Sequence, residues 1–205
     1  MAKSGRIEIF LGPMFSGKTS SLLERSTEER LAGHPVVVYK PIHLSGDRDP
    51  AGAVRTHGGL VIREEPHTLR LAELRIVEVV EKDGRIAFDL GDLDALEPDA
   101  AIAINEGQFF ANIVEFADLA AERGHSVYVA GCDGTWAREP FGRILELIPK
   151  AEHVEKLSGI CMECRTSRSS FSGRTGSSTE VVLIGGLDDY RGVCRACYMR
   201  SKSAR

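Results

Sequence analysis

Short runs of apolar residues alternate with segments of helical spacing along most of the chain. The apolar runs lie at Ile7–Leu11, Val36–Tyr39, Ala101–Ile104 and Ser126–Ala130. Continuous apolar runs of this length are typical of strands that are buried on both faces. Helix-compatible sequence stands between them, at Ser20–Leu31 and after Phe110. This alternation predicts an α/β fold in which flanking helices cover both faces of a parallel sheet.

The stretch from residue 64 to residue 99 has a less regular pattern. Its apolar spacing favours one or two helices that would contain Leu69, Leu71, Leu74, Val77 and Val80. Lys82–Arg85 is typical of a turn, and Ile86–Phe88 of a short strand.

The composition changes after Leu157, where Ser, Gly, Arg and Cys replace the alternating pattern. A chain of 205 residues can bury one core and carry a small appendage. We therefore expect two domains, a nucleotide-binding domain over residues 1–157 and a smaller domain over residues 158–205.

The net charge of −4 is unevenly distributed. From Ser158 onward there are eight Lys/Arg and four Asp/Glu, which leaves the first 157 residues at −8. The basic tail could indicate nucleic acid, but we interpret it as a solvated terminus and expect no nucleic-acid partner. The polar N-terminus shows no signal-peptide pattern, and no apolar run is long enough to span a membrane. We expect a cytoplasmic protein without a membrane partner.

The first apolar run leads directly into Gly12-Pro13-Met14-Phe15-Ser16-Gly17-Lys18-Thr19. This octet matches the phosphate-binding pattern G-x-x-x-x-G-K-S/T between a strand and a helix. In such a loop, backbone N–H groups and the helix N-terminus point at phosphate oxygens. Lys18 would reach the terminal phosphates, and the Thr19 hydroxyl would be offered to Mg²⁺. The sequence therefore predicts binding of a nucleoside triphosphate.

Four of the five cysteines form two C-x-x-C knuckles, Cys161 with Cys164 and Cys194 with Cys197. Two knuckles can place four thiolates around one tetrahedral Zn²⁺ ion, which leaves no open coordination position. The pattern favours a structural zinc site over reduced buried cysteines or a redox pair. Cys132 stands alone, and we interpret it as a small apolar residue.

Asn105 and Glu106 follow the apolar run Ala101–Ile104. In a phosphate-loop protein, a carboxylate at this strand end usually helps to hold Mg²⁺. Here the first position is the neutral Asn105. Glu106 is placed to orient a substrate hydroxyl and accept its proton, although it could also be an ordinary acid at a helix start.

Several motifs occur in an order that resembles one family. They are Gly12–Thr19 with Pro-Met-Phe-Ser inside the loop, Glu106-Gly-Gln-Phe-Phe, Asp133-Gly-Thr, Pro140-Phe141-Gly142, the paired knuckles, and Ile184-Gly185-Gly186 followed by Tyr190. Together they resemble the zinc-containing thymidine kinases, the phosphate-loop type shared by bacteria and animal cytosol. The resemblance covers the whole chain apart from residues 64–99.

The resemblance implies transfer of the ATP γ-phosphate to the 5′-hydroxyl of thymidine, and usually of deoxyuridine, in nucleoside salvage for DNA synthesis. It implies that Glu106 accepts the hydroxyl proton and that Arg48 neutralises charge on the transferring group. The other expected ATP contacts are Gly12, Pro13, Met14, Phe15, Ser16, Gly17, Lys18, Thr19, Asp47, Asn105, Gly107 and Gln108. From the residues alone, Asp47 and Arg48 belong to a polar loop.

The resemblance also implies an apolar slot for the base, walled by Met14, Phe109, Trp136 and Phe141. Each aromatic residue taken singly could equally be part of the core. The smaller domain would resemble a zinc ribbon that carries a lid loop over the nucleoside. The lid residues would be Val181, Val182, Leu183, Ile184 and Gly185, with Tyr190 near the sugar. Zinc would anchor both ends of the lid, which would exclude water.

The family resemblance further suggests a homotetramer and feedback inhibition by the thymidine triphosphate. Two positions depart from the family pattern, because Asn105 stands where Asp is usual and Trp136 where Phe is common. Two other functions stay open at this point. A nucleotide sensor with little turnover would fit the neutral Asn105, and a zinc-bearing ATPase acting on nucleic acid would fit the basic C-terminal region.

Overall fold

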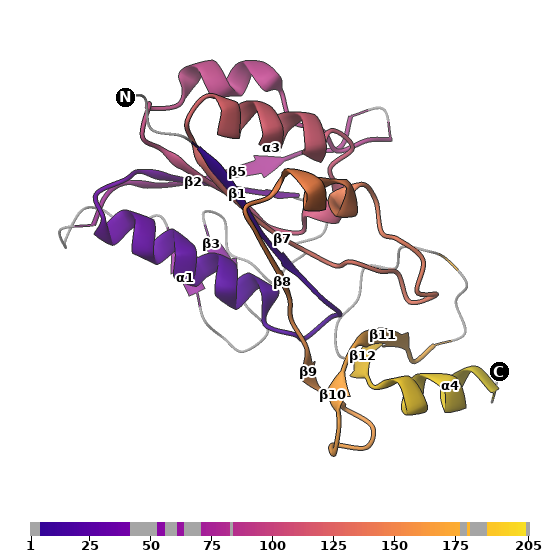
Figure 1. Cartoon of the computed structure of the whole chain (residues 1–205). Coiled ribbons are helices and arrows are strands. Elements are labelled where there is room, and N and C mark those ends of the chain that lie inside the picture. Colours follow the sequence, from indigo (N-terminus) through magenta and orange to yellow (C-terminus); the bar gives the residue numbers. More distant parts are fainter. Residues whose placement is uncertain are drawn as a thin grey trace.

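The computed structural model describes residues 5–41, 53–55, 61–63, 71–82, 84–176, 180 and 188–203. Its centre is a six-stranded sheet in the order β5-β2-β6-β7-β1-β8, in which every pairing is parallel (Figure 1). In chain order, these strands are β1 (Arg6–Leu11), β2 (Val36–Pro41), β5 (Leu74–Val79), β6 (Ala101–Ile104), β7 (Ser126–Gly131) and β8 (His153–Lys156). The apolar runs form β1, β2, β6 and β7, which confirms the predicted parallel sheet.

Helices cover both faces of this sheet, as the alternating pattern predicts. Helix α1 (Lys18–Leu31) packs on one face, where Leu22 and Leu23 belong to the same buried cluster as Phe10. The opposite face carries α3 (Ile113–Glu122) and the 3-10 helices η2 (Leu90–Ala95) and η4 (Ile144–Lys150) (Figure 1). Ile9 packs on this second face, because neighbouring side chains of a strand point to opposite sides. Strands β1, β2, β6 and β7 are buried along almost their whole length because both of their faces are covered.

The helical prediction is wrong for its described part, residues 71–80. Leu74–Val79 forms β5, which pairs in parallel with β2 along its whole length. Ile76 packs on the α1 side, while Val77 and Val79 pack on the α3 side, which is the two-residue period of a strand. Pairing with β2 and the β-branched composition outweigh the helical spacing of the leucines. Leu69 lies outside the described residues.

The neighbouring predictions have mixed outcomes. The turn at Lys82–Arg85 is confirmed, because the backbone N–H of each of these two residues donates to the carbonyl of the other, at 2.8 and 3.0 Å. Ile86 forms only an isolated bridge with Phe110, so the short strand expected at Ile86–Phe88 does not extend. No apolar pattern predicts β8, because the four side chains of this edge strand are all exposed.

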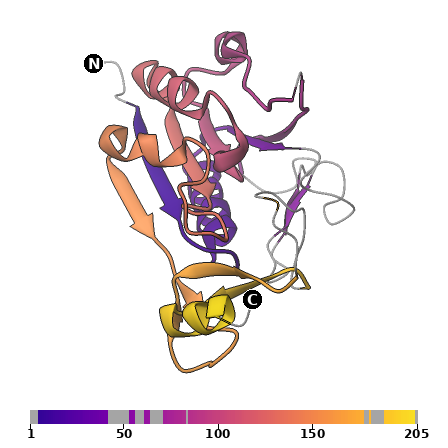
Figure 2. The ribbon, with the colours of Figure 1, turned by 90° about the vertical axis from the view of Figure 1, so that its right-hand side faces the viewer.

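The C-terminal unit, residues 159–176 and 188–203, lies beyond the carboxyl ends of β1 and β8 (Figure 2). It contains two antiparallel pairs, β9 (Gly159–Ile160) with β10 (Arg168–Ser169) and β11 (Phe171–Arg174) with β12 (Tyr190–Val193), followed by α4 (Arg195–Ser203). A further antiparallel pair joins β3 (Ala53–Arg55) to β4 (Val61–Arg63). Strand β8 ends and β9 begins on either side of residue 157, but the division into two domains there stays a prediction.

Candidate active site

The phosphate loop, residues Gly12–Thr19, connects β1 to α1 at the carboxyl edge of the sheet. Helix α1 begins after Gly17, which has φ 95°, without a side-chain cap and without an acid in its first turn. The N–H groups at this helix end are therefore available to an anion. Lys18 is buried, and its Nζ donates to the Pro13 carbonyl at 2.7 Å. The ammonium group thus lies folded back against the loop that would hold the phosphates.

The strand end after β6 approaches the first turn of α1. The Thr19 hydroxyl donates to Asn105 Oδ1 at 3.3 Å, and the Asn105 backbone N–H donates to the Tyr39 carbonyl at 2.9 Å. Two neutral oxygen atoms, a hydroxyl and an amide, therefore stand together beside the phosphate loop. Oxygen donors suit Mg²⁺, which usually keeps several waters and binds substrate phosphates as well.

Glu106 follows directly, at the start of the 3-10 turn η3 (Gly107–Phe109). Its backbone has φ 56° and ψ 46°, in the left-handed region that residues with a Cβ rarely occupy. Its carboxylate is half-buried and accepts a hydrogen bond from Gln108 Nε2 at 2.6 Å. The turn therefore holds a carboxylate at the same sheet edge as the phosphate loop.

Cys132 follows β7 at this edge. Burial raises the pKa of its thiol to about 11, although the nearby Lys18 ammonium acts in the opposite direction. The thiol is therefore neutral, in agreement with its interpretation as a small apolar residue. The Cys132 backbone N–H donates to Gln108 Oε1 at 3.0 Å, which connects this strand end to the turn that holds Glu106.

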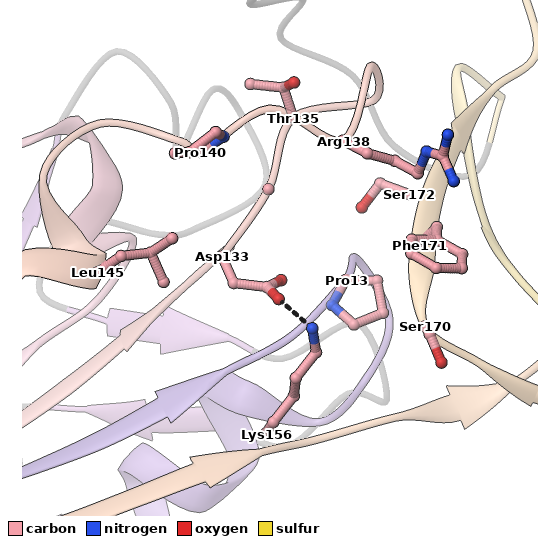
Figure 3. Close-up of a pocket in the computed structure, with 11 residues that line it drawn as sticks. Pro13, Asp133, Thr135, Arg138, Pro140, Leu145, Lys156, Ser170, Phe171 and Ser172 are labelled. Carbon is pink, nitrogen blue, oxygen red and sulfur yellow. Dashed lines mark ion pairs between the residues drawn. The ribbon is translucent and has the colours of Figure 1, made fainter. Parts of the chain in front are cut away.

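A pocket of about 220 Å³ opens between the phosphate loop and the C-terminal unit (Figure 3). Asp133 and Lys156 form an ion pair of 2.7 Å across it, and Pro13 lies beside them. Ser172 and Phe171 contribute the wall from β11. The sequence pointed to Pro13 and Asp133, but it gave no signal for Lys156 or for the β11 residues.

The aromatic residues expected at the base slot fall into two groups. Phe109 and Phe141 meet edge to face, with ring centroids 5.1 Å apart. Trp136 and Tyr190 both lie against the Arg174 guanidinium, whose Cζ is 5.1 Å from each ring centroid. Arg174 Nη2 also donates to the Tyr190 hydroxyl at 2.6 Å. Sequence reasoning missed Arg174, a buried arginine within an otherwise polar segment.

The four knuckle cysteines converge in the C-terminal unit. All four sulfur atoms lie within 4.8 Å of one another, and Cys164 Sγ is 3.9 Å from Cys194 Sγ. A tetrahedral ion with Zn–S bonds of about 2.3 Å requires sulfur atoms about 3.8 Å apart, so the cluster fits Zn²⁺. Hydrogen bonds from Thr166 lower the pKa of the Cys164 thiol, whereas burial raises the pKa of the Cys197 thiol. A bound metal ion would hold both as thiolates.

The C-terminal unit also holds the phosphate loop from outside. Ser172, a buried residue of β11, accepts a hydrogen bond from the Met14 backbone N–H at 2.9 Å. Met14 itself is half-buried. The loop is therefore supported by a strand that is 158 residues away in the sequence.

Comparison with known proteins agrees with this geometry. A family model described as thymidine kinase matches residues 5–198. The chain belongs to the thymidine kinase family. Similar proteins include the thymidine kinase of variola virus, 38% identical over 197 residues that cover 96% of this chain and 98% of the viral one. Human cytosolic thymidine kinase is 37% identical over 201 residues, which cover 98% of this chain and 76% of the human one.

Membership of the thymidine kinase family confirms the resemblance seen in the motifs, and the cysteine cluster fits the expected zinc-ribbon-like part. Several residues expected at the site lie outside the described residues, namely Asp47, Arg48, Val181, Val182, Leu183, Ile184 and Gly185.

Among the helices that the structure describes, none has the length and apolar character that a membrane crossing requires.

Proposed function

We propose that this chain is an ATP-dependent thymidine kinase, which transfers the γ-phosphate of ATP to the 5′-hydroxyl of thymidine and forms dTMP. One observation carries the proposal: in a chain matched to this family over residues 5–198, the Thr19 hydroxyl of the phosphate loop donates to Asn105 Oδ1 at 3.3 Å, and the carboxylate of Glu106 follows directly in the chain. The family defines the reaction, and the geometry supplies a phosphate-binding loop next to a proton acceptor. Deoxyuridine is a second expected substrate, and the product would serve DNA synthesis in nucleoside salvage.

In this proposal, residues Gly12–Thr19 hold the triphosphate and Glu106 orients the 5′-hydroxyl. As the hydroxyl oxygen attacks the γ-phosphorus, its proton passes to the Glu106 carboxylate and ADP leaves. Lys18 and Arg48 neutralise charge on the transferring group, and Asp47 belongs to the same group of phosphate-proximal residues. Asn105, Gly107 and Gln108 complete the expected ATP-proximal set.

Two metal ions have different roles in this proposal. The Thr19 and Asn105 oxygen atoms would be the protein neighbours of Mg²⁺, which supplies positive charge to the phosphates when it is bound with ATP. Zn²⁺ would be held by the four cysteine thiolates and would have a structural role, because four protein ligands leave no position for substrate.

The base would lie against Met14, Phe109, Phe141 and Trp136, because flat aromatic surfaces stack favourably on a pyrimidine ring. The edge-to-face contact of Phe109 with Phe141 supports one wall of this slot. Val181–Gly185 would close over the nucleoside, and Tyr190 would lie near the sugar. The Trp136 indole N–H donates to the carbonyl of Glu180, which precedes Val181 in the chain, at 3.0 Å.

The remaining features of the proposal concern the protein as a whole. We propose a homotetramer with feedback inhibition by the thymidine triphosphate, which acts in the cytoplasm. The name of the human relative, cytosolic thymidine kinase, supports this location.

An assay of ATP consumption tests the proposal against its two alternatives. A thymidine kinase consumes ATP only when thymidine is present and yields dTMP. A nucleotide sensor, which the neutral Asn105 would allow, binds without turnover, and a nucleic-acid ATPase responds to DNA or RNA instead. Replacement of Glu106 with glutamine should lower the rate of dTMP formation about 10²- to 10⁴-fold and leave ATP binding intact. Undiminished dTMP formation by Glu106→Gln would refute the assigned chemistry.

A further inference from the structure

The carboxamide of Gln108 connects two strand ends of the candidate active site. The residue is buried, with 4% of its surface exposed. Its Nε2 donates to Glu106 Oε2 at 2.6 Å, and its Oε1 accepts from the Cys132 backbone N–H at 3.0 Å. One side chain thus joins the turn after β6 to the residue that follows β7.

The contact with Cys132 fixes the direction in which the carboxamide faces. A backbone N–H can only donate a hydrogen bond, so the atom opposite it has to be the carboxamide oxygen of Gln108. The NH₂ group is consequently turned toward Glu106. An ionised carboxylate only accepts hydrogen bonds, so donor and acceptor are matched at both ends of the side chain.

Close packing keeps Gln108 in this position. A Cβ atom at Gly131 would lie 2.5 Å from Gln108 Oε1, and a Cβ atom at Gly142 would lie 2.0 Å from the Gln108 carbonyl oxygen. Two neighbouring segments therefore pack directly on this residue, and both depend on glycine to do so.

Glu106 needs such support, because its backbone lies in the left-handed region and the 3-10 turn that it begins has no side-chain cap. We propose that Gln108 is a positioning residue, which holds the Glu106 carboxylate in the orientation that accepts the proton of the substrate hydroxyl. This inference rests on the role proposed above for Glu106. It gives Gln108 a role different from the ATP contact that the family resemblance implies.

Two substitutions in the full chain separate the contacts of Gln108. Gln108→Met has a similar length but removes both hydrogen bonds. Gln108→Glu keeps an acceptor for the Cys132 N–H but places a second carboxyl group against Glu106, so that the two carboxyl groups share a proton and Glu106 is no longer a free proton acceptor. We expect kcat for dTMP formation to fall about 100-fold in both variants, since small displacements of a reacting group have effects of this size. The KM values for ATP and thymidine should change less than about threefold, because binding is retained. A wild-type kcat in Gln108→Glu would overturn the proposal even if Gln108→Met does not fold.

Asn112→Leu is a matched control for loss of a bridging carboxamide. Asn112 forms two hydrogen bonds with the Phe88 backbone, both 2.9 Å long. This variant should lower the thermal midpoint but leave kcat unchanged. If it lowers kcat as much as the Gln108 substitutions do, the effect is general destabilisation and the positioning role is refuted.

A double-mutant cycle with Glu106→Gln decides whether Gln108 acts through Glu106. If it does, Gln108→Met causes no further loss of kcat once Glu106 has been replaced. Losses that multiply would overturn the positioning role. An undiminished rate in Glu106→Gln alone would refute the function assigned to Glu106. A large loss in Glu106→Gln together with normal rates in both Gln108 variants would overturn the positioning role alone.

Discussion

Ser172 lies outside the phosphate loop, but its replacement with alanine should weaken ATP binding. The substitution removes the acceptor of the 2.9 Å hydrogen bond from the half-buried Met14 N–H. A hydrogen bond of this kind contributes about 1 kcal/mol, and loss of its partner costs about 1–3 kcal/mol. The loop then has to be ordered when ATP binds, so part of this free energy is taken from the binding free energy. We expect the Kd for ATP to rise about five- to tenfold, since 1.4 kcal/mol corresponds to a factor of ten.

Isothermal titration calorimetry of ATP binding measures this effect directly. Ser172→Thr keeps the Oγ atom and should bind ATP with nearly wild-type affinity. Ser170→Ala is a neighbouring control, because the Ser170 backbone hydrogen bond to the Val193 carbonyl, 3.0 Å long, is retained. If Ser172→Ala lowers the thermal midpoint but leaves the Kd for ATP unchanged, the C-terminal unit does not preorganise the phosphate loop.

Four further predictions concern the metal sites, the base slot and the core. Removal of zinc with a chelator should weaken ATP binding more than Ser172→Ala does, and a calorimetric Kd that is unchanged after full removal would contradict this. Asn105→Asp should raise activity at limiting Mg²⁺, since it restores a charge beside Thr19, and equal rates of both forms across a Mg²⁺ titration would speak against it. Phe141→Ala should raise the KM for thymidine about tenfold and change the KM for ATP little, because one aromatic wall of the base slot is lost. A change in the KM for ATP alone would exclude a role of Phe141 in the base slot. Burial acts to raise the pKa of Glu29. Hydrogen bonds from Tyr128 and His34 outweigh this effect and lower the pKa below the ordinary 4.5. These contacts therefore stabilise the fold above that pH and lose their effect as the pH falls below it. The difference in free energy of unfolding between wild type and Glu29→Gln should shrink on acidification, and a constant difference in urea titrations would show that the contacts contribute nothing.

Several parts of the site could be predicted because each is a contiguous pattern. The phosphate loop between β1 and α1, the two cysteine knuckles and the Asn105–Glu106 pair after β6 all combine residue types with a short, fixed spacing. Such spacing fixes local backbone geometry, and parallel strands bring their carboxyl ends to one edge. The convergence of these motifs therefore followed from the fold class, and the fold class followed from the apolar runs.

The helical prediction for Leu74–Val79 is wrong because apolar spacing alone does not distinguish a short helix from a strand. The same apolar residues fit a helix by spacing and a strand by composition, and pairing with β2 decided the outcome. The edge strand β8 gave no apolar signal, because an exposed strand has no face that must be buried.

The sequence by itself determined the fold class, the phosphate loop, the cysteine cluster and the carboxylate at residue 106, because short-range patterns encode all of these. Only the tertiary structure decided which groups support them. Gln108 meets the Cys132 N–H across 24 residues, and Ser172 meets Met14 across 158. Hydrogen bonds between such distant residues depend on how strands pack in three dimensions, and no local spacing in the chain records them.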